Sequence, residues 1–130
     1  MKVLVADSQP SVRHALSVWI NGQLGWVIVG ESSDASDLLD KLIWLAPELI
    51  IMDSDLPGMA SKELVTKIRH GSKEVAIIFL YNSSMEQFFP DKLDVDFYAS
   101  KIDPPARILE TFLKADAWFE NKSIKSQNRS

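Results

Sequence analysis

The sequence predicts one α/β domain, with a parallel sheet between two layers of helices. Short apolar runs alternate along the chain with segments of helical periodicity, and each run ends at a polar or turn-forming residue. The run Leu49–Met52 contains no polar residue, which is typical of a strand buried on both faces of a parallel sheet. Right-handed crossovers then give a doubly wound domain. We expect the flavodoxin-like strand order 2-1-3-4-5, although periodicity alone does not fix that order.

Five strands are expected from apolar, partly β-branched runs that are bounded by turn signals. In chain order they are Val3–Ala6, Trp26–Gly30, Leu49–Met52, Val75–Leu80 and Val95–Ala99. The last of these runs is the least apolar, so we expect it near an edge of the sheet.

Five helices are expected between and after the strands, from apolar residues at helical spacing or from start and stop signals. They run from Pro10 (with Ser8 as cap) to Asn21-Gly22, from Ala35 to Pro47, from Ser61 or Lys62 to His70-Gly71, over Ser83–Phe89, and onward from Pro104-Pro105. The chain turns polar from Asn121. We therefore expect a domain over residues 1–120, and over 121–130 a polar tail or the start of a linker to an output domain outside this chain.

Composition narrows the class of protein. The chain has 130 residues, 46% of them hydrophobic and 25% charged, as in ordinary globular domains. Its net charge of −4 argues against direct nucleic-acid binding, and the lack of cysteine excludes disulfides and thiolate metal sites. No apolar run approaches membrane-spanning length, and the N-terminus lacks the hydrophobic region of a signal peptide. These features predict a cytoplasmic domain without membrane contact.

Polar side chains follow the strands at the edge of the sheet where ligands bind in open α/β folds. They are Asp7 and Ser8 after the first strand, Asp53 and Asp55 after the third, Tyr81 after the fourth and Lys101 after the fifth. In the expected strand order Asp7 and Asp53 converge, and paired carboxylates with a nearby lysine suit Mg²⁺ and a phosphoryl group. This pattern favours phosphoryl transfer to Asp53 as a nucleophile. The simpler alternative is that Asp53 only caps the turn before Pro57-Gly58.

From Lys2 to about Phe119 the chain resembles the receiver domain of two-component response regulators, in particular those with a LuxR/NarL-type output domain. The resemblance rests on VLVADSQPSVR, VIVGESSD, PELIIMDSDLPGM and DFYASK. It implies that Asp53 accepts a phosphoryl group from a histidine kinase, while Lys101 contacts that group. It also implies Mg²⁺ ligation by Asp7, Asp53 and the carbonyl of Asp55, and a switching aromatic side chain at Tyr98.

Several positions depart from the family pattern, and we therefore class the receiver as atypical. Ser8 stands where the family usually has a second acid at the metal, so weak Mg²⁺ binding is expected. Tyr81 stands where a Thr or Ser normally contacts the phosphoryl group, and its bulk is expected to fill the space into which Tyr98 would rotate. Pro90 shortens the fourth helix, and Ile102 stands where proline often follows the lysine.

Two main hypotheses remain open at this point. One is a phosphorylated receiver that regulates a transcriptional output domain; the other is a pseudo-receiver, a protein-interaction module that works without phosphorylation. A phosphatase based on Asp53-Ser54-Asp55 is a third reading, but that motif normally ends a first strand. We expect no enzyme beyond receiver self-phosphorylation. The expected partners are a histidine kinase, a second copy in a homodimer, and a C-terminal DNA-binding domain in a longer parent.

Overall fold

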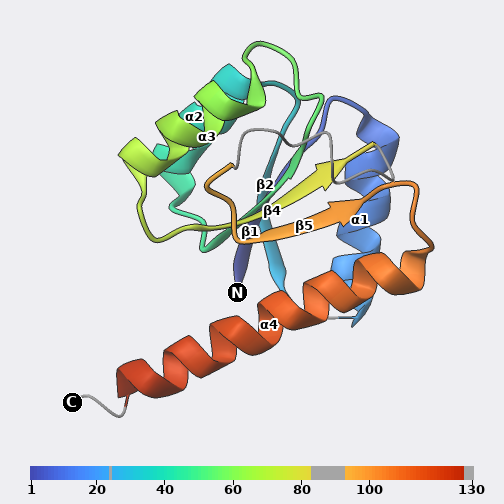
Figure 1. Ribbon diagram of the computed structural model, residues 1–130, viewed down its shortest axis with the longest axis vertical. Helices are drawn as coiled ribbons and strands as arrows, with labels where there is room; N and C mark the ends of the chain where they lie inside the picture. The colour runs from blue at the N-terminus through green and yellow to red at the C-terminus, as the bar shows by residue number, and fades with distance from the viewer. Residues whose placement is uncertain (24, 83–92, 128–130) are drawn as a thin grey trace.

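A five-stranded parallel sheet forms the centre of the protein in a computed structural model, which describes residues 1–23, 25–82 and 93–127 (Figure 1). The strand order is β2-β1-β3-β4-β5, so the predicted order is confirmed. The strands are β1 (Lys2–Ala6), β2 (Val27–Ser32), β3 (Leu49–Asp53), β4 (Ala76–Tyr81) and β5 (Phe97–Ser100). Every residue of β3 and β4 is buried, as their unbroken apolar sequences predicted.

The helices of the described residues are α1 (Pro10–Gln23), α2 (Ala35–Leu45), α3 (Ser61–Gly71) and α4 (Pro105–Gln127). The helix expected over Ser83–Phe89 lies outside these residues. Asp34 caps α2, because its carboxylate accepts a hydrogen bond from the backbone N–H of Asp37 at 2.8 Å. Helix α1 continues through Asn21-Gly22 to Gln23 instead of ending there.

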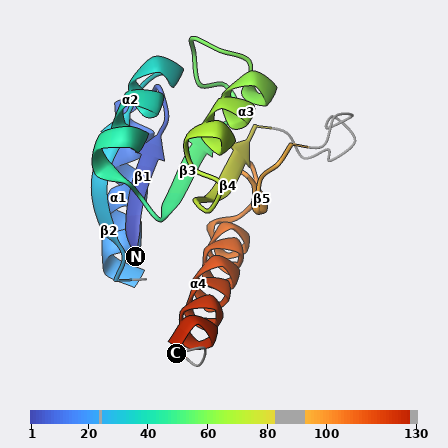
Figure 2. The same cartoon turned by 90° about the vertical axis from the view of Figure 1, so that its left-hand side faces the viewer.

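Helix α4 is longer than the sequence suggested. It continues to Gln127, past the point near Asn121 where the chain turns polar and a tail was expected. No proline or glycine follows Pro105 within it, so nothing in the sequence breaks the helix. Its C-terminal half projects from the body of the domain (Figures 1 and 2). The domain boundary at residue 120 stays a prediction.

Two hydrophobic layers hold the helices against the sheet. Helices α2 and α3 cover one face, and α1 and α4 cover the other (Figure 1). On the α1 and α4 face, the fully buried Phe112 packs against Trp26 and Trp19, with ring centroids 5.9 and 5.3 Å apart. The Trp26 indole N–H also donates to the Asp116 carboxylate at 2.8 Å. These contacts anchor α4 to the sheet and agree with a packing role for Trp19 and Trp26.

Strand β5 begins at Phe97, two residues later than predicted, because Asp96 holds the chain just before it. The Asp96 carboxylate accepts a hydrogen bond from the backbone N–H of Ile77 at 2.8 Å and pairs with the Arg69 guanidinium at 3.0 Å. Arg69, whose side chain is 15% exposed, also donates to the carbonyl of Asp94 at 2.9 Å and 3.0 Å. Arg69 thus fastens the end of α3 to the start of β5.

Within the described segments, no helix has both the length and the apolar character needed to span a membrane.

Candidate site at the carboxyl edge of the sheet

Asp7, Asp53 and Lys101 come together at the carboxyl edge of the sheet. Asp7 directly follows β1 and Asp53 ends β3, and these two strands are neighbours in the sheet. Both residues are nearly inaccessible, with relative exposures of 1% and 4%. Two buried acids side by side repel each other and lose their hydration, so a cation must compensate them.

Lys101 supplies that cation. Its ammonium group donates a hydrogen bond to Asp7 Oδ2 and lies 2.9 Å from Asp53 Oδ1. The contact with Asp53 is an ion pair with poor hydrogen-bond geometry, and Asp53 Oδ1 has no well-aligned donor among the described residues. Burial alone would lower the pKa of Lys101, but the close contacts and charges of Asp7 and Asp53 outweigh burial and raise this pKa above its ordinary value. Lys101 therefore stays protonated between the two acids.

Arg13 is a residue of the site that the sequence reasoning did not single out. Its guanidinium donates to the backbone carbonyl of Asp7 at 2.7 Å and pairs with Glu31 at 3.2 Å. The Asp7 carboxylate also accepts a hydrogen bond from the backbone N–H of Gln9 at 2.9 Å. Together these contacts fix the loop between β1 and α1. The sequence feature that could have identified Arg13 is a basic residue one turn into the helix that follows Asp7.

Ser8 and Asp55 lie at the same edge but do not join the buried acids through their side chains. Both residues are exposed, and the Asp55 carboxylate accepts a hydrogen bond from the side-chain amide of Asn82. The sequence left open whether Asp55 turns inward; in the structure it pairs with Asn82 instead. The roles of Ser8 and of the Asp55 carbonyl at a metal remain predictions.

The two tyrosines lie on adjacent strands. The pairing of β4 with β5 sets Phe79 opposite Tyr98 and Tyr81 opposite Ser100, so the tyrosines are diagonal neighbours on one face. Tyr81 is 8% exposed and belongs to the core under α2 and α3, whereas Tyr98 is 39% exposed. The Tyr98 hydroxyl donates to the carbonyl of Leu93 at 3.2 Å, and burial raises the pKa of Tyr98. Whether Tyr81 restricts Tyr98 stays a prediction.

The donor set fits a hydrated Mg²⁺ held by few protein ligands. Among the residues that the structure describes, no group of three or more acidic, histidine or cysteine side chains is placed to hold a metal. Two carboxylates do meet there, and Asp53 Oδ1 is a buried acceptor that lacks a well-aligned donor. Mg²⁺ usually keeps several waters and takes one or two carboxylates. Asp7 and Asp53 are therefore the side chains that would hold it.

Comparison with known proteins identifies the family of the chain. A family model for the response regulator receiver domain matches residues 3–100. The transcriptional activator protein ExaE of Pseudomonas putida is 27% identical over 112 residues, which are 85% of this chain and 52% of ExaE. The response regulator protein VraR of Staphylococcus epidermidis is 27% identical over 126 residues, 95% of this chain and 59% of VraR. The chain thus spans between half and three fifths of these relatives.

Solved structures share the fold. The REC domain of AraT, a response regulator from Geobacillus stearothermophilus, has a TM-score of 0.80 at 23% identity, covering 94% of this chain and 97% of that one. A structure of two RcsB dimers bound to two parallel DNAs has a TM-score of 0.79 at 21% identity, covering 90% and 64%. The family match covers most of the chain and includes Asp7 and Asp53. The chain therefore belongs to the response regulator receiver domain family.

Proposed function

We propose that this receiver accepts a phosphoryl group on Asp53 from a histidine kinase. The observation that carries the proposal is the pairing of a buried Asp53 carboxylate with the Lys101 ammonium 2.9 Å away. A carboxylate oxygen of Asp53 attacks the phosphorus of a phosphohistidine, the new P–O bond forms as the P–N bond breaks, and the imidazole leaves. The acceptor must be anionic and its surroundings must tolerate added negative charge, and Lys101 meets the second requirement.

The neighbouring residues act as positioning and neutralising groups in this proposal. Lys101 neutralises oxygens of the transferred phosphoryl group. Asp7, fixed by Gln9 and Arg13, would hold Mg²⁺ together with Asp53. When bound, Mg²⁺ supplies positive charge that screens the incoming phosphoryl group from the carboxylates.

We also propose that the phosphorylated domain regulates a transcriptional output. The curated relatives are named as a transcriptional activator and a response regulator, and both extend well beyond the part that this chain matches. A DNA-binding output domain of LuxR type, following α4 in a longer parent, is the partner that this comparison favours. RcsB is described as a dimer on DNA, which supports a homodimer as the working assembly.

A pseudo-receiver is the second candidate function, and two observations favour it. Lys101 contacts and compensates both buried acids, and the exposed Ser8 adds no third charge. Tyr81 is buried where the family has a small hydroxyl residue. In that case the same fold presents its surfaces to a partner whatever the state of Asp53.

Intact-mass measurement after incubation with acetyl phosphate and Mg²⁺ tests the proposed function. We expect one phosphoryl group on the chain and none on Asp53→Asn. Asp55→Asn is the matched control, because Asp55 is the exposed neighbouring acid, and it should still be labelled. Labelling that survives Asp53→Asn would place the acceptor elsewhere. No labelling of the unaltered chain by acetyl phosphate or by a phosphorylated histidine kinase would favour the pseudo-receiver.

A further inference from the structure

The last turn of α2 exposes two large apolar side chains next to each other. Ile43 is 77% exposed and Trp44 is 84% exposed, while Leu38 and Leu42 on the other side of the same helix are buried. An indole side chain offers roughly 200 Å² of surface, and most of it here faces water. Tryptophan is the residue type most enriched among the energetic anchors of protein interfaces.

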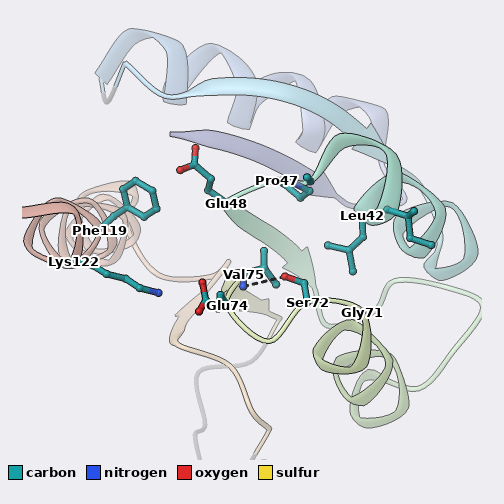
Figure 3. A pocket seen from close by; sticks show the side chains of 11 residues that line it. Leu42, Pro47, Glu48, Gly71, Ser72, Glu74, Val75, Phe119 and Lys122 are labelled. Carbon is teal, nitrogen blue, oxygen red and sulfur yellow. Dashed lines mark hydrogen bonds between the residues drawn. The ribbon is translucent and has the colours of Figure 1, made fainter. Parts of the chain in front are cut away.

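A hollow of about 790 Å³ lies beside this pair, at the amino edge of the sheet. Ile43 forms part of its wall, together with Leu42 and Pro47 from the end of α2, Val75 before β4 and Phe119 of α4. Figure 3 shows Leu42 on one side of the hollow and Phe119 on the other. This volume is within the range of cavities that bind small ligands, so it is sufficient for an indole side chain.

Charges of both signs border the hollow. Glu74 precedes β4 and Lys122 lies on the projecting part of α4, and Figure 3 shows both side chains at the same end of the hollow. A surface that carries a projecting aromatic group, a hollow and both charges can be complementary to itself. A two-fold axis brings the same patch of two copies together. If one residue of the first copy contacts a second residue of the other copy, the reciprocal contact forms as well.

We propose that the α2 end patch, defined as Ile43, Trp44, the hollow, Glu74 and Lys122, is an interface between two copies of this chain. Trp44 of each copy enters the hollow of the other, and Glu74 of each copy faces Lys122 of the other. The patch lies at the amino ends of β3 and β4, whereas Asp7 and Asp53 lie at the carboxyl edge. Pairing through it therefore does not cover the edge of the sheet that holds the acceptor carboxylate.

The area of the patch sets the expected strength of the pair. Two indoles bury about 400 Å² by themselves, and the eleven residues lining each hollow add to this. A standard specific interface buries about 1,600 Å² and uses roughly 20 to 30 residues a side. The eleven lining residues and Trp44 make up about half of that number of residues, which places the patch among weak interfaces.

Sedimentation velocity over about 5 to 500 µM, which brackets a micromolar constant, tests the proposal. We expect a monomer–dimer equilibrium that Trp44→Glu weakens at least about tenfold, because a buried carboxylate replaces the anchor. Val18→Glu is the matched control, since Val18 is 59% exposed on α1, on the opposite face, and should leave the equilibrium unchanged. Unaltered circular dichroism verifies the fold of each variant.

Charge variants give an independent measurement. Glu74→Lys alone and Lys122→Glu alone place like charges across the interface, so each should be more monomeric than the unaltered chain. Mixing the two variants pairs a patch with two lysines against a patch with two glutamates, and dimers should reappear in the mixture. A chain that stays monomeric throughout, dimers that Val18→Glu but not Trp44→Glu dissociates, or a mixture without recovery would each overturn the proposal. A strictly monomeric chain would leave the hollow to a different partner.

Discussion

Replacing Lys101 by methionine is the sharpest perturbation of the acidic site. The substitution keeps the length and the apolar stem of the side chain and removes only the ammonium group. The side chains of Asp7 and Asp53 are 2% and 5% exposed, while that of Lys101 is 19% exposed. The variant thus leaves two nearly inaccessible carboxylates with no cation between them.

The size of the effect follows from the geometry. At the 2.9 Å separation of Lys101 and Asp53, two unit charges attract by about 6 kcal/mol if the effective dielectric constant is about 20. Desolvation of the lysine offsets a large part of this attraction. Removing one partner of a fully buried pair costs about 3–5 kcal/mol. Because Lys101 reaches solvent, we discount that figure and expect the free energy of unfolding to fall by about 2–4 kcal/mol.

Urea unfolding at pH 7, followed by circular dichroism, measures the loss. Lys67→Met is the matched control, because Lys67 forms an exposed pair with Glu63 at 3.6 Å, and it should change the free energy by less than about 0.5 kcal/mol. Mg²⁺ should stabilise Lys101→Met more than the unaltered chain, since the metal then replaces the ammonium. A loss equal to that of Lys67→Met would refute the view that Lys101 compensates the buried acids.

The raised pKa of Lys101 gives the sign of the pH effect on stability. The folded chain holds the lysine proton more tightly than the unfolded chain does. The resulting stability is complete below the unfolded value, about 10.4, and is lost as the pH rises through the higher folded value. The difference in stability between the unaltered chain and Lys101→Met should therefore decline as the pH rises above that unfolded value and through the folded one.

Two further substitutions test other parts of the argument. Ser8→Asp adds an anionic oxygen near Asp7, so it should tighten Mg²⁺ in a calorimetric titration and speed the labelling of Asp53 by acetyl phosphate; equal affinities would mean that Ser8 is not at the metal. Arg69→Met leaves the Asp96 carboxylate, whose side chain is 30% exposed, without its cation and removes the bonds to the Asp94 carbonyl. It should lower the free energy of unfolding, measured by urea unfolding, by about 1–3 kcal/mol, mainly through the lost hydrogen bonds, because the exposed ion pair itself contributes little. Arg107→Met on the exposed face of α4 is its control.

Most of the fold could be predicted from the sequence because the apolar runs are clear. Strands β3 and β4 begin and end within one residue of their predicted bounds. Buried parallel strands contain few polar residues, so the change to polar residues marks where each strand ends. Strand β2 extends to Ser32 beyond the predicted Gly30, because a strand with only one neighbour tolerates the polar Glu31. The length of α4 was missed because polar composition was taken as the end of a helix, while only a breaker residue ends one reliably.

The residues that form the site could be predicted from the sequence, but the contacts between them could not. Strand order alone brings Asp7 and Asp53 to one edge, and a lysine after β5 reaches them. The pairing of Asp55 with Asn82 and the bond from Arg13 to the Asp7 carbonyl depend on loop conformations that residue spacing does not encode. Side-chain direction at loop residues is set by such local hydrogen bonds, so sequence reasoning left the inward or outward turn of Asp55 open.

The charge of the site connects its stability to its proposed chemistry. Two buried carboxylates and one ammonium group leave one net negative charge, where a further acid at position 8 would leave two. The smaller negative charge makes the metal-free site less strained, because Lys101 nearly balances it, and for the same reason it attracts Mg²⁺ less strongly. A divalent cation would have to compete with an ammonium group that already contacts both acids. Metal binding and stability without metal thus change in opposite directions, and under the proposed function Ser8 and Lys101 together would set the balance between a phosphorylated receiver and a phosphorylation-independent one.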